Sequence, residues 1–197
     1  MKRSITFALS IVIALTLSTT TLADYDSDTD YMAVMIEAVC EGDVEKGTLA
    51  QKRRDEKIEE QGLEFSGVSF EDLYYLSKIM YAEAGSLWLS DDWKMAVGEV
   101  VLNRVASPEF PDTVKSVIEA PGQYYGKNSS YFANLKTTEY ITALAIRLLE
   151  GERVMGNPAV VFQSNGKQGG GVFWKLEDPQ LGATYFCYSN HIELYEG

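Results

Sequence analysis

The hydrophobic pattern of the chain changes once, near residue 150, and this change limits the folds that the chain can adopt. Between 65 and 150, apolar residues recur at spacings of three and four, which is typical of helices with one buried face. After 150, apolar residues come in short β-branched and aromatic runs, separated by glycine-rich turn sequences. Strands that follow helices, instead of alternating with them, favour an α+β fold over a doubly wound parallel sheet.

Three long helices are predicted before this change. The first begins after Ser69, a hydroxyl residue suited to an N-cap, and ends at Gly85. The second spans 91–105 and the third 137–150, with a short helix and a loop at 121–126 between them. Antiparallel strands are expected at 159–164, 171–176 and 184–188. We therefore expect about three core helices packed on a small antiparallel sheet.

The aromatic residues are concentrated in the second part of the chain. Of the 23 aromatic residues, 20 lie in 65–197, which we expect to be the domain that contains the hydrophobic core. Residues 24–64 carry a net charge of −8 and are expected to form one or two surface helices that end near Gly62. The charged run at 51–60 is interpreted as a solvated helix face, with a partner-binding surface as the alternative. Residues 65–197 are therefore expected to fold without this extension.

The first 23 residues have the pattern of a secretory signal peptide. Lys2 and Arg3 precede an apolar run at 5–17, and Thr-Leu-Ala at 21–23 offers small residues for cleavage. The apolar run is too short to span a membrane comfortably, although an uncleaved N-terminal anchor is the alternative. We expect a secreted protein, extracellular or associated with the cell wall, that is not inserted in a membrane after cleavage.

Composition argues against two classes of function. The net charge of −12 disfavours a nucleic-acid partner, because such proteins need basic surfaces to neutralise phosphates. The chain has one histidine and two cysteines, which makes a zinc site improbable because such sites take three or four ligands of these types or carboxylates. No metal or cofactor is implied, and we expect a monomer.

The two cysteines allow more than one interpretation. Secretion would permit a Cys40–Cys187 disulfide, but nothing in the spacing argues for it, and two unpaired thiols are the alternative. Cys187 and His191 could also form a nucleophile pair. Four residues apart on a strand, they would lie about 13 Å from each other. A buried strand cysteine is therefore the preferred interpretation.

Glu83 is the most informative candidate for catalysis. Leu73, Leu76 and Met80 form an apolar stripe on the first core helix, and Glu83 is its next member. Burial and the negative end of the helix dipole both disfavour an ionised carboxylate, and a glutamic acid that stays protonated suits a general acid. The alternative is a carboxylate that turns to solvent or pairs with a lysine.

Other acids on the second helix have structural interpretations. Glu99 also interrupts an apolar run and could be a second catalytic carboxylate. We prefer an ion pair or solvent exposure on a mixed flank of the helix. Asp91 and Asp92 are explained by the favourable position of acids at a helix N-terminus.

Polar side chains in two loops could bind sugars. Gln123, Tyr124 and Tyr125 lie in a loop bounded by glycines, where exposed aromatic faces can stack on sugars and amides can bond hydroxyls. Ordinary loop packing is the alternative. The expected strand at 159–164 leads into a glycine-rich turn, where a second group could line the same cleft: Gln163, Ser164 and Asn165.

Three motifs in this order resemble the SleB/CwlJ-type cell wall hydrolases. They are YAEAG at 81–85, GEVVLNRV at 98–105, and FPDTVKSVI at 110–118 with PGQY at 121–124. The resemblance covers about 70–191 and ends on an aromatic strand, TYFCYSNH. It implies a lysozyme-like α+β fold.

The resemblance also implies which residues act. The family's catalytic glutamate corresponds to Glu83, and Tyr81 of the same motif is implied to contact the substrate. Ser86 stands where many relatives have an arginine followed by Gly-Glu, so a second acid is missing from this loop. A transglycosylase can work with one acid, whereas a lysozyme-like hydrolase uses two carboxylates.

These observations predict an enzyme that acts on peptidoglycan glycan strands. The resemblance implies cleavage of the bond between N-acetylmuramic acid and N-acetylglucosamine by lytic transglycosylation. The alternatives are a glycan-binding protein without turnover and, with less support, a cell wall amidase or peptidase. Whether the setting is the spore cortex during germination or the vegetative wall stays open.

Overall fold

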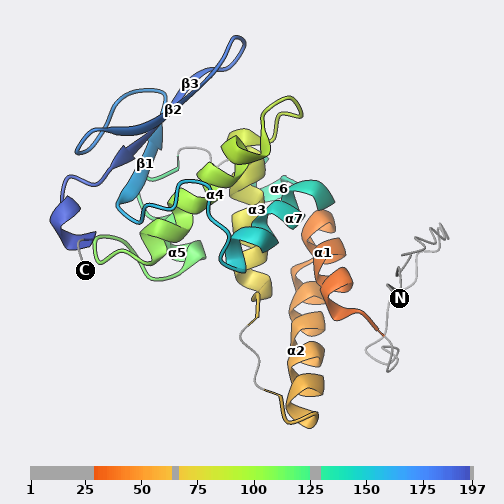
Figure 1. Cartoon of the computed structure of the whole chain (residues 1–197). Coiled ribbons are helices and arrows are strands. Elements are labelled where there is room, and N and C mark those ends of the chain that lie inside the picture. The colour runs from red at the N-terminus through yellow and green to blue at the C-terminus, as the bar shows by residue number, and fades with distance from the viewer. Residues whose placement is uncertain (1–28, 64–66, 125–129, 196–197) are drawn as a thin grey trace, which may run out of the picture.

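The chain folds into a helical body with a small sheet at one end. The computed structural model describes residues 29–63, 67–124 and 130–195, so the expected signal peptide at 1–23 lies outside the described residues. The helices are α1 (Tyr31–Glu41), α2 (Val44–Glu60), α3 (Phe70–Ala84), α4 (Asp91–Val105), α5 (Val114–Glu119), α6 (Ser130–Asn134) and α7 (Glu139–Leu149). The strands are β1 (Val160–Ser164), β2 (Val172–Asp178) and β3 (Gly182–Tyr188), and a 3₁₀ helix covers Ile192–Tyr195. Figure 1 shows the α1–α2 hairpin on one side of the body and the sheet on the other.

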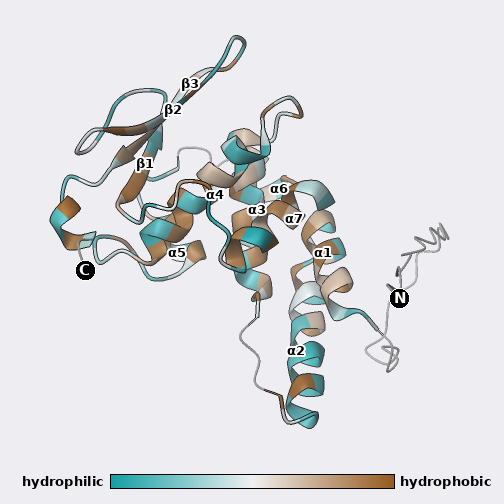
Figure 2. Ribbon diagram, viewed as in Figure 1, coloured by the Kyte–Doolittle hydropathy of each residue, from teal (hydrophilic) through white to brown (hydrophobic). Residues whose placement is uncertain are grey.

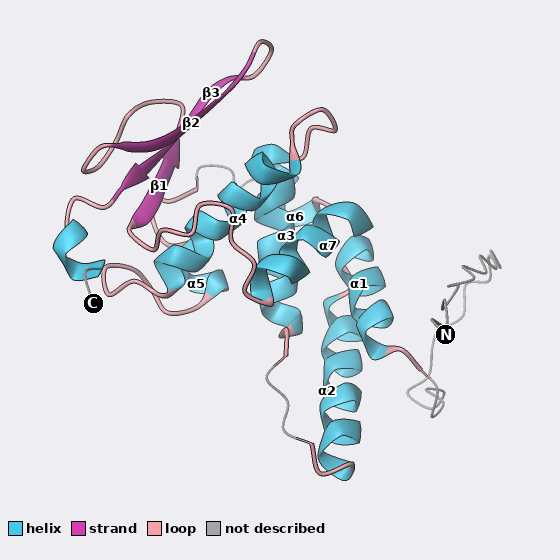
Figure 3. Cartoon of the chain, in the orientation of Figure 1, coloured by secondary structure: helices cyan, strands magenta, loops and turns pink. Residues whose placement is uncertain are grey.

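The predicted α+β class is confirmed. Helices and strands occupy separate parts of the molecule (Figure 3), and the three strands form an antiparallel sheet of order β1-β3-β2. All three expected strands are present, and β2 and β3 are longer than expected because they continue into a hairpin around residues 179–181. The short α6 and the final 3₁₀ helix were not among the expected elements.

Helix α3 begins and ends where its sequence predicts. The Ser69 hydroxyl accepts a hydrogen bond from the Asp72 backbone N–H at 3.1 Å, as an N-cap does. At the other end, Gly85 has φ −71°, so it does not adopt the left-handed conformation expected of a glycine that ends a helix. A Cβ atom at Gly85 would lie 2.3 Å from the Tyr81 carbonyl oxygen. Glycine is therefore needed here for close packing of the backbone.

Helix α4 is the centre of the fold. Its bounds agree with the prediction, but it is buried on nearly all sides, whereas the sequence predicts one buried face. Helices α3, α5 and α7 and strand β1 all pack against it. Helix α7 lies close to α4 at Gly98, where a Cβ atom would lie 2.5 Å from Leu148 Cδ1 of α7. This packing holds the sheet against the helical body.

Glu99 of α4 is neither exposed nor held by a lysine or arginine in the described structure, so both preferred interpretations are wrong. Its side chain is 0% exposed, and its carboxylate accepts three backbone N–H bonds. The donors are Val154, Met155 and Gly156, at 2.7, 2.9 and 2.8 Å. Glu99 therefore fixes the segment between α7 and β1, which is a structural role.

Replacement of Glu99 by glutamine is expected to destabilise the fold. The amide keeps the shape, but its NH₂ group would face backbone donors and leave at least one charge-assisted bond unmade. We expect a loss of about 2 kcal/mol in the free energy of unfolding, measured by urea denaturation. Glu152→Gln, which removes an exposed pair with Arg147, should cost less than about 1 kcal/mol. Equal stabilities of the two variants would contradict this role of Glu99.

The two N-terminal helices are present as predicted, but they are not surface helices alone. Met35, Ala38 and Val39 of α1 and Ala50 of α2 belong to the same buried cluster as the core of α3 and α7. The rest of α2 is largely hydrophilic (Figure 2). A domain boundary near residue 64 stays a prediction, although α1 and α2 contribute to a shared core.

Contacts between α2 and the start of α3 are tight. The Phe70 ring packs over Gly47, where a Cβ atom would lie 2.0 Å from the ring. The buried Arg54 donates a hydrogen bond to the Val68 carbonyl oxygen at 2.9 Å. These contacts hold the hairpin against the rest of the molecule.

The cysteines are free, so the alternative of unpaired thiols is observed. Cys40 lies on α1, and Cys187 is buried in β3, as preferred for a strand cysteine. His191 is exposed and contacts Glu193 instead. Within the described ranges, no helix is long and apolar enough to cross a membrane.

Candidate active site

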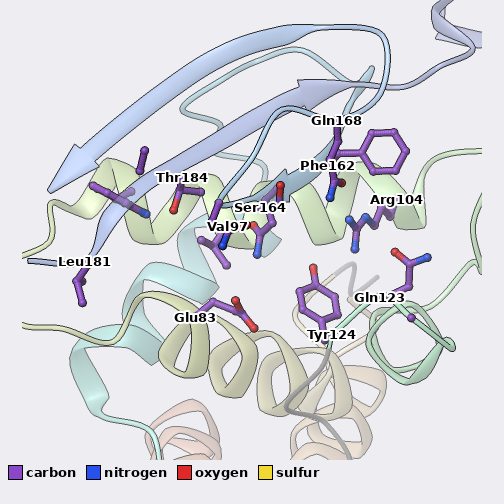
Figure 4. Close-up of a pocket in the computed structure, with 15 residues that line it drawn as sticks. Glu83, Val97, Arg104, Gln123, Tyr124, Phe162, Ser164, Gln168, Leu181 and Thr184 are labelled. Carbon is purple, nitrogen blue, oxygen red and sulfur yellow. The ribbon is translucent and has the colours of Figure 1, made fainter.

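A pocket of about 610 Å³ lies between the helical body and the sheet (Figure 4). Its walls come from the end of α3, one side of α4, the loop after α5, strand β1 and the start of β3. The lining residues are Glu83, Trp93, Val97, Arg104, Gly122, Gln123, Tyr124, Phe162, Gln163, Ser164, Asn165, Gln168, Leu181, Ala183 and Thr184. Helix α3 and strand β1 thus meet at one site, although they are far apart in the sequence.

Glu83 is the only acid among the residues that line this pocket. It lies in the last turn of α3, and its carboxyl group faces the pocket on the same side as Tyr124 (Figure 4). The side chain is accessible to solvent, but the surrounding pocket walls raise the pKa of the carboxyl group, and the positive charge of Arg104 partly opposes this rise. No hydrogen bond or ion pair to Glu83 is found among the described residues. The carboxyl group is therefore accessible and biased towards its protonated form.

Arg104 of α4 is a pocket residue to which the sequence analysis assigned no function. Its side chain is only 3% exposed, and its guanidinium group lies 5.3 Å from each of the Phe110 and Tyr124 ring centres. Its Nε donates to the Val161 carbonyl oxygen at 2.6 Å. The sequence signal for Arg104 is the same as for Glu83, since each of these charged residues continues an apolar stripe on its own helix.

Tyr124 lies in the pocket wall, but it is not the exposed loop residue that the sequence predicts. Its side chain is 5% exposed and belongs to the main hydrophobic core. Its phenolic oxygen is buried without a hydrogen-bond partner in the described structure. The prediction that a sugar stacks on an exposed face of this ring is therefore wrong. The loop at 121–124 turns inward because the Tyr124 ring packs on Arg104.

The structure brings together six of the eight residues that the sequence analysis proposed for the site. Glu83, Gln123, Tyr124, Gln163, Ser164 and Asn165 all line the pocket. Tyr81 does not line it and packs partly buried against the main core instead. Tyr125 lies outside the described residues.

The remaining lining residues add neutral and aromatic groups. Gln168 and Thr184 bring an amide and a hydroxyl, and Trp93, Phe162 and Leu181 bring apolar surface. Sequence analysis missed Gln168, Leu181 and Thr184 because the β2–β3 hairpin and the turn after β1 gave no chemical signal of their own. The pocket thus holds one acid and one arginine among amides, hydroxyls and aromatic faces, with a few polar groups that could orient a bound ligand.

The family comparison agrees with this chemistry. Residues 90–187 match the family described as Cell Wall Hydrolase, so this part of the chain belongs to that family. The match confirms the resemblance and places the protein among enzymes that cleave the cell wall. The matched range begins at residue 90, after Glu83, so the catalytic role of Glu83 stays a prediction.

Two solved structures are similar to the chain. The catalytic domain of the germination-specific lytic transglycosylase SleB from Bacillus anthracis has 24% identity and a TM-score of 0.47, over 63% of this chain and 99% of that one. The catalytic domain of the Bacillus cereus SleB protein has 22% identity and a TM-score of 0.47, over 62% and 94%. The comparison with curated proteins gives no match.

Proposed function

We propose that this protein is a secreted enzyme that cuts the bond between N-acetylmuramic acid and N-acetylglucosamine in peptidoglycan by lytic transglycosylation. The observation that carries the proposal is the single acid, Glu83, in a pocket whose other lining residues are the buried Arg104, amides, hydroxyls and apolar faces. The family match to cell wall hydrolases supports the substrate. Secretion is supported by the signal-peptide pattern at 1–23.

In this mechanism Glu83 acts first as an acid and then as a base. The protonated carboxyl group gives its proton to the glycosidic oxygen as the bond to C1 of the muramic residue breaks. The C6 hydroxyl of the same sugar then attacks C1, and the Glu83 carboxylate takes up the hydroxyl proton. The products are a 1,6-anhydro end and a free hydroxyl on the leaving sugar, and Glu83 is protonated again.

The absence of a second acid from the lining residues favours this reaction over hydrolysis with two carboxylates. The buried Glu99 does not line the pocket and is held by backbone N–H groups. Assistance at C1 would come from the N-acetyl group of the substrate. We expect the protein to act as a monomer.

Release of dye from labelled cell walls tests turnover. Folded wild-type protein is expected to release soluble labelled fragments with new anhydro ends. Binding to the walls without release would favour the glycan-binding alternative. New amine ends without new glycan ends would favour an amidase or peptidase.

The pH dependence of stability follows from the raised pKa of Glu83. Because the folded state holds this proton more tightly than the unfolded chain, stability is lost as pH rises from about 4.5 through the raised pKa. Glu83→Gln removes this dependence. We expect the two proteins to melt at similar temperatures at pH 4 and the variant to melt higher at pH 7. A wild-type protein that gains stability relative to the variant as pH rises would contradict the shift.

Activity, like stability, is expected to fall as pH rises. A general acid must be protonated, so the rate of wall cleavage is expected to fall as pH rises through the raised pKa of Glu83. The measurement is the rate of dye release from pH 4 to 9. A rate that rises steadily over this range would argue against a protonated Glu83 as the acid.

A further inference from the structure

Three polar atoms in the wall of the Glu83 pocket are buried without partners in the described structure. They are Arg104 Nη1, Tyr124 Oη and Gln163 Oε1. A buried polar group without a hydrogen bond costs about 1–3 kcal/mol, and more if it is charged. Proteins keep few such groups, so three in one pocket wall are positions that bound water or a ligand would complete.

Arg104 cannot easily turn away to find a partner elsewhere. The Phe110 and Tyr124 rings lie 5.3 Å from its guanidinium carbon, and its Nε is bound to the Val161 carbonyl oxygen. The guanidinium group is thus fixed before any ligand arrives, with Nη1 left to donate. Figure 4 shows Arg104 and the Tyr124 hydroxyl facing the same pocket as Glu83.

The three atoms offer complementary chemistry. Arg104 Nη1 can only donate, and the raised pKa of Tyr124, caused by burial, keeps its hydroxyl protonated and able to donate. Gln163 Oε1 can only accept. A ligand that satisfies all three must present an acceptor oxygen and an N–H or O–H donor.

The charge of the pocket favours a neutral ligand. Arg104 and Glu83 are the only charged residues that line it, and a carboxylate bound at Arg104 would share the pocket with the carboxylate that Glu83 becomes after it gives up its proton. An amide group has a carbonyl oxygen and an N–H group side by side and carries no charge. It matches the two donors and the acceptor without a counterion.

We propose that Arg104, Tyr124 and Gln163 form a subsite that binds the acetamido group of an N-acetylhexosamine. The carbonyl oxygen accepts from Arg104 and Tyr124, and the amide N–H donates to Gln163. The inference rests on the proposed function for the assignment of the ligand to a glycan strand. The subsite would make cleavage depend on N-acetylation, because a free glucosamine amine is protonated and would face Arg104.

Binding of two defined oligosaccharides tests the subsite without turnover. Calorimetry with Glu83→Gln protein, which should not consume the ligand, compares the N-acetylglucosamine tetramer with the glucosamine tetramer. We expect the acetylated tetramer to bind at least about tenfold more tightly. Equal binding of both tetramers, or binding of neither by the folded protein, would overturn the proposal.

Single substitutions then assign the preference to these residues. Tyr124→Phe keeps the ring on Arg104 and removes only the hydroxyl, and Gln163→Leu removes the acceptor. Each should weaken binding of the acetylated tetramer about three- to tenfold and leave the glucosamine tetramer unchanged. Tyr75→Phe, a matched change on α3 outside this pocket, should alter neither. An equal loss of affinity for both tetramers in folded variants would mean that these residues do not bind the acetamido group.

Cell walls separate this inference from the proposed function. Wild-type protein should cleave N-acetylated walls faster than chemically de-N-acetylated walls. Cleavage of both at one rate would rule out the subsite and the N-acetyl assistance at C1, and would leave glycosidic cleavage with Glu83 as the acid. Selective binding of the acetylated tetramer without cleavage of any wall would keep the subsite and remove the proposed turnover.

Discussion

Glu83→Gln is expected to leave the protein folded and to lower the release of fragments from peptidoglycan by about 10²–10⁴-fold. The amide has nearly the shape of the carboxyl group but cannot donate a proton to a leaving oxygen at neutral pH. Because desolvation by the pocket walls raises the pKa of Glu83, loss of the carboxyl group should not cost stability at pH 7. Dye release and thermal melting of the same preparation measure both effects.

Glu71→Gln is the matched control for this change. Glu71 lies on the same helix, is exposed, and pairs with Lys115 at 3.3 Å, away from the pocket. Exposed pairs contribute about 0–1 kcal/mol, so activity and stability should both stay close to wild type. A Glu83→Gln protein that keeps more than about a tenth of the activity would show that Glu83 is not the acid.

Removal of residues 24–64 is expected to prevent stable folding of the remaining chain. The shared core would lose Met35, Ala38, Val39 and Ala50. The Phe70 ring would lose its packing against Gly47 of α2. Loss of a single large buried side chain costs about 2–5 kcal/mol, and a whole domain is stable by only about 5–15 kcal/mol. We therefore expect the opposite of the sequence-based prediction for 65–197.

Urea denaturation compares this truncated chain with a control that begins at residue 24. The control retains α1 and α2 and should unfold in one cooperative transition. The truncated chain should be insoluble or lack such a transition. A soluble 65–197 protein with the same midpoint as the control would show that the N-terminal hairpin is dispensable.

Features with local causes could be predicted from the sequence. The Ser69 cap and apolar spacing gave the bounds of α3, because Ser69 bonds to the first turn of its own helix. Apolar spacing alone gave the bounds of α4. Glu83 could be singled out because a carboxyl group continues an apolar stripe. Arg104 gave the same signal on α4, but its chemistry became clear only with Tyr124 beside it.

Features that depend on distant contacts could not be predicted. Glu99 is held by N–H groups 55–57 residues further along the chain, and no local pattern indicates those donors. Tyr124 looked exposed because glycines surround it, yet it packs on an arginine from another helix. The buried face of α1 was missed because charged residues dominate the composition of 24–64.

Mass spectrometry of digested peptidoglycan tests the central claim most directly, because it identifies the broken bond and the product together. Purified muropeptides are compared after incubation with wild-type protein and with Glu83→Gln. The account predicts fragments that end in 1,6-anhydro-N-acetylmuramic acid from the wild type and none from the variant. Reducing ends without anhydro ends would contradict transglycosylation, and intact glycan strands with cleaved peptides would contradict glycosidic cleavage altogether.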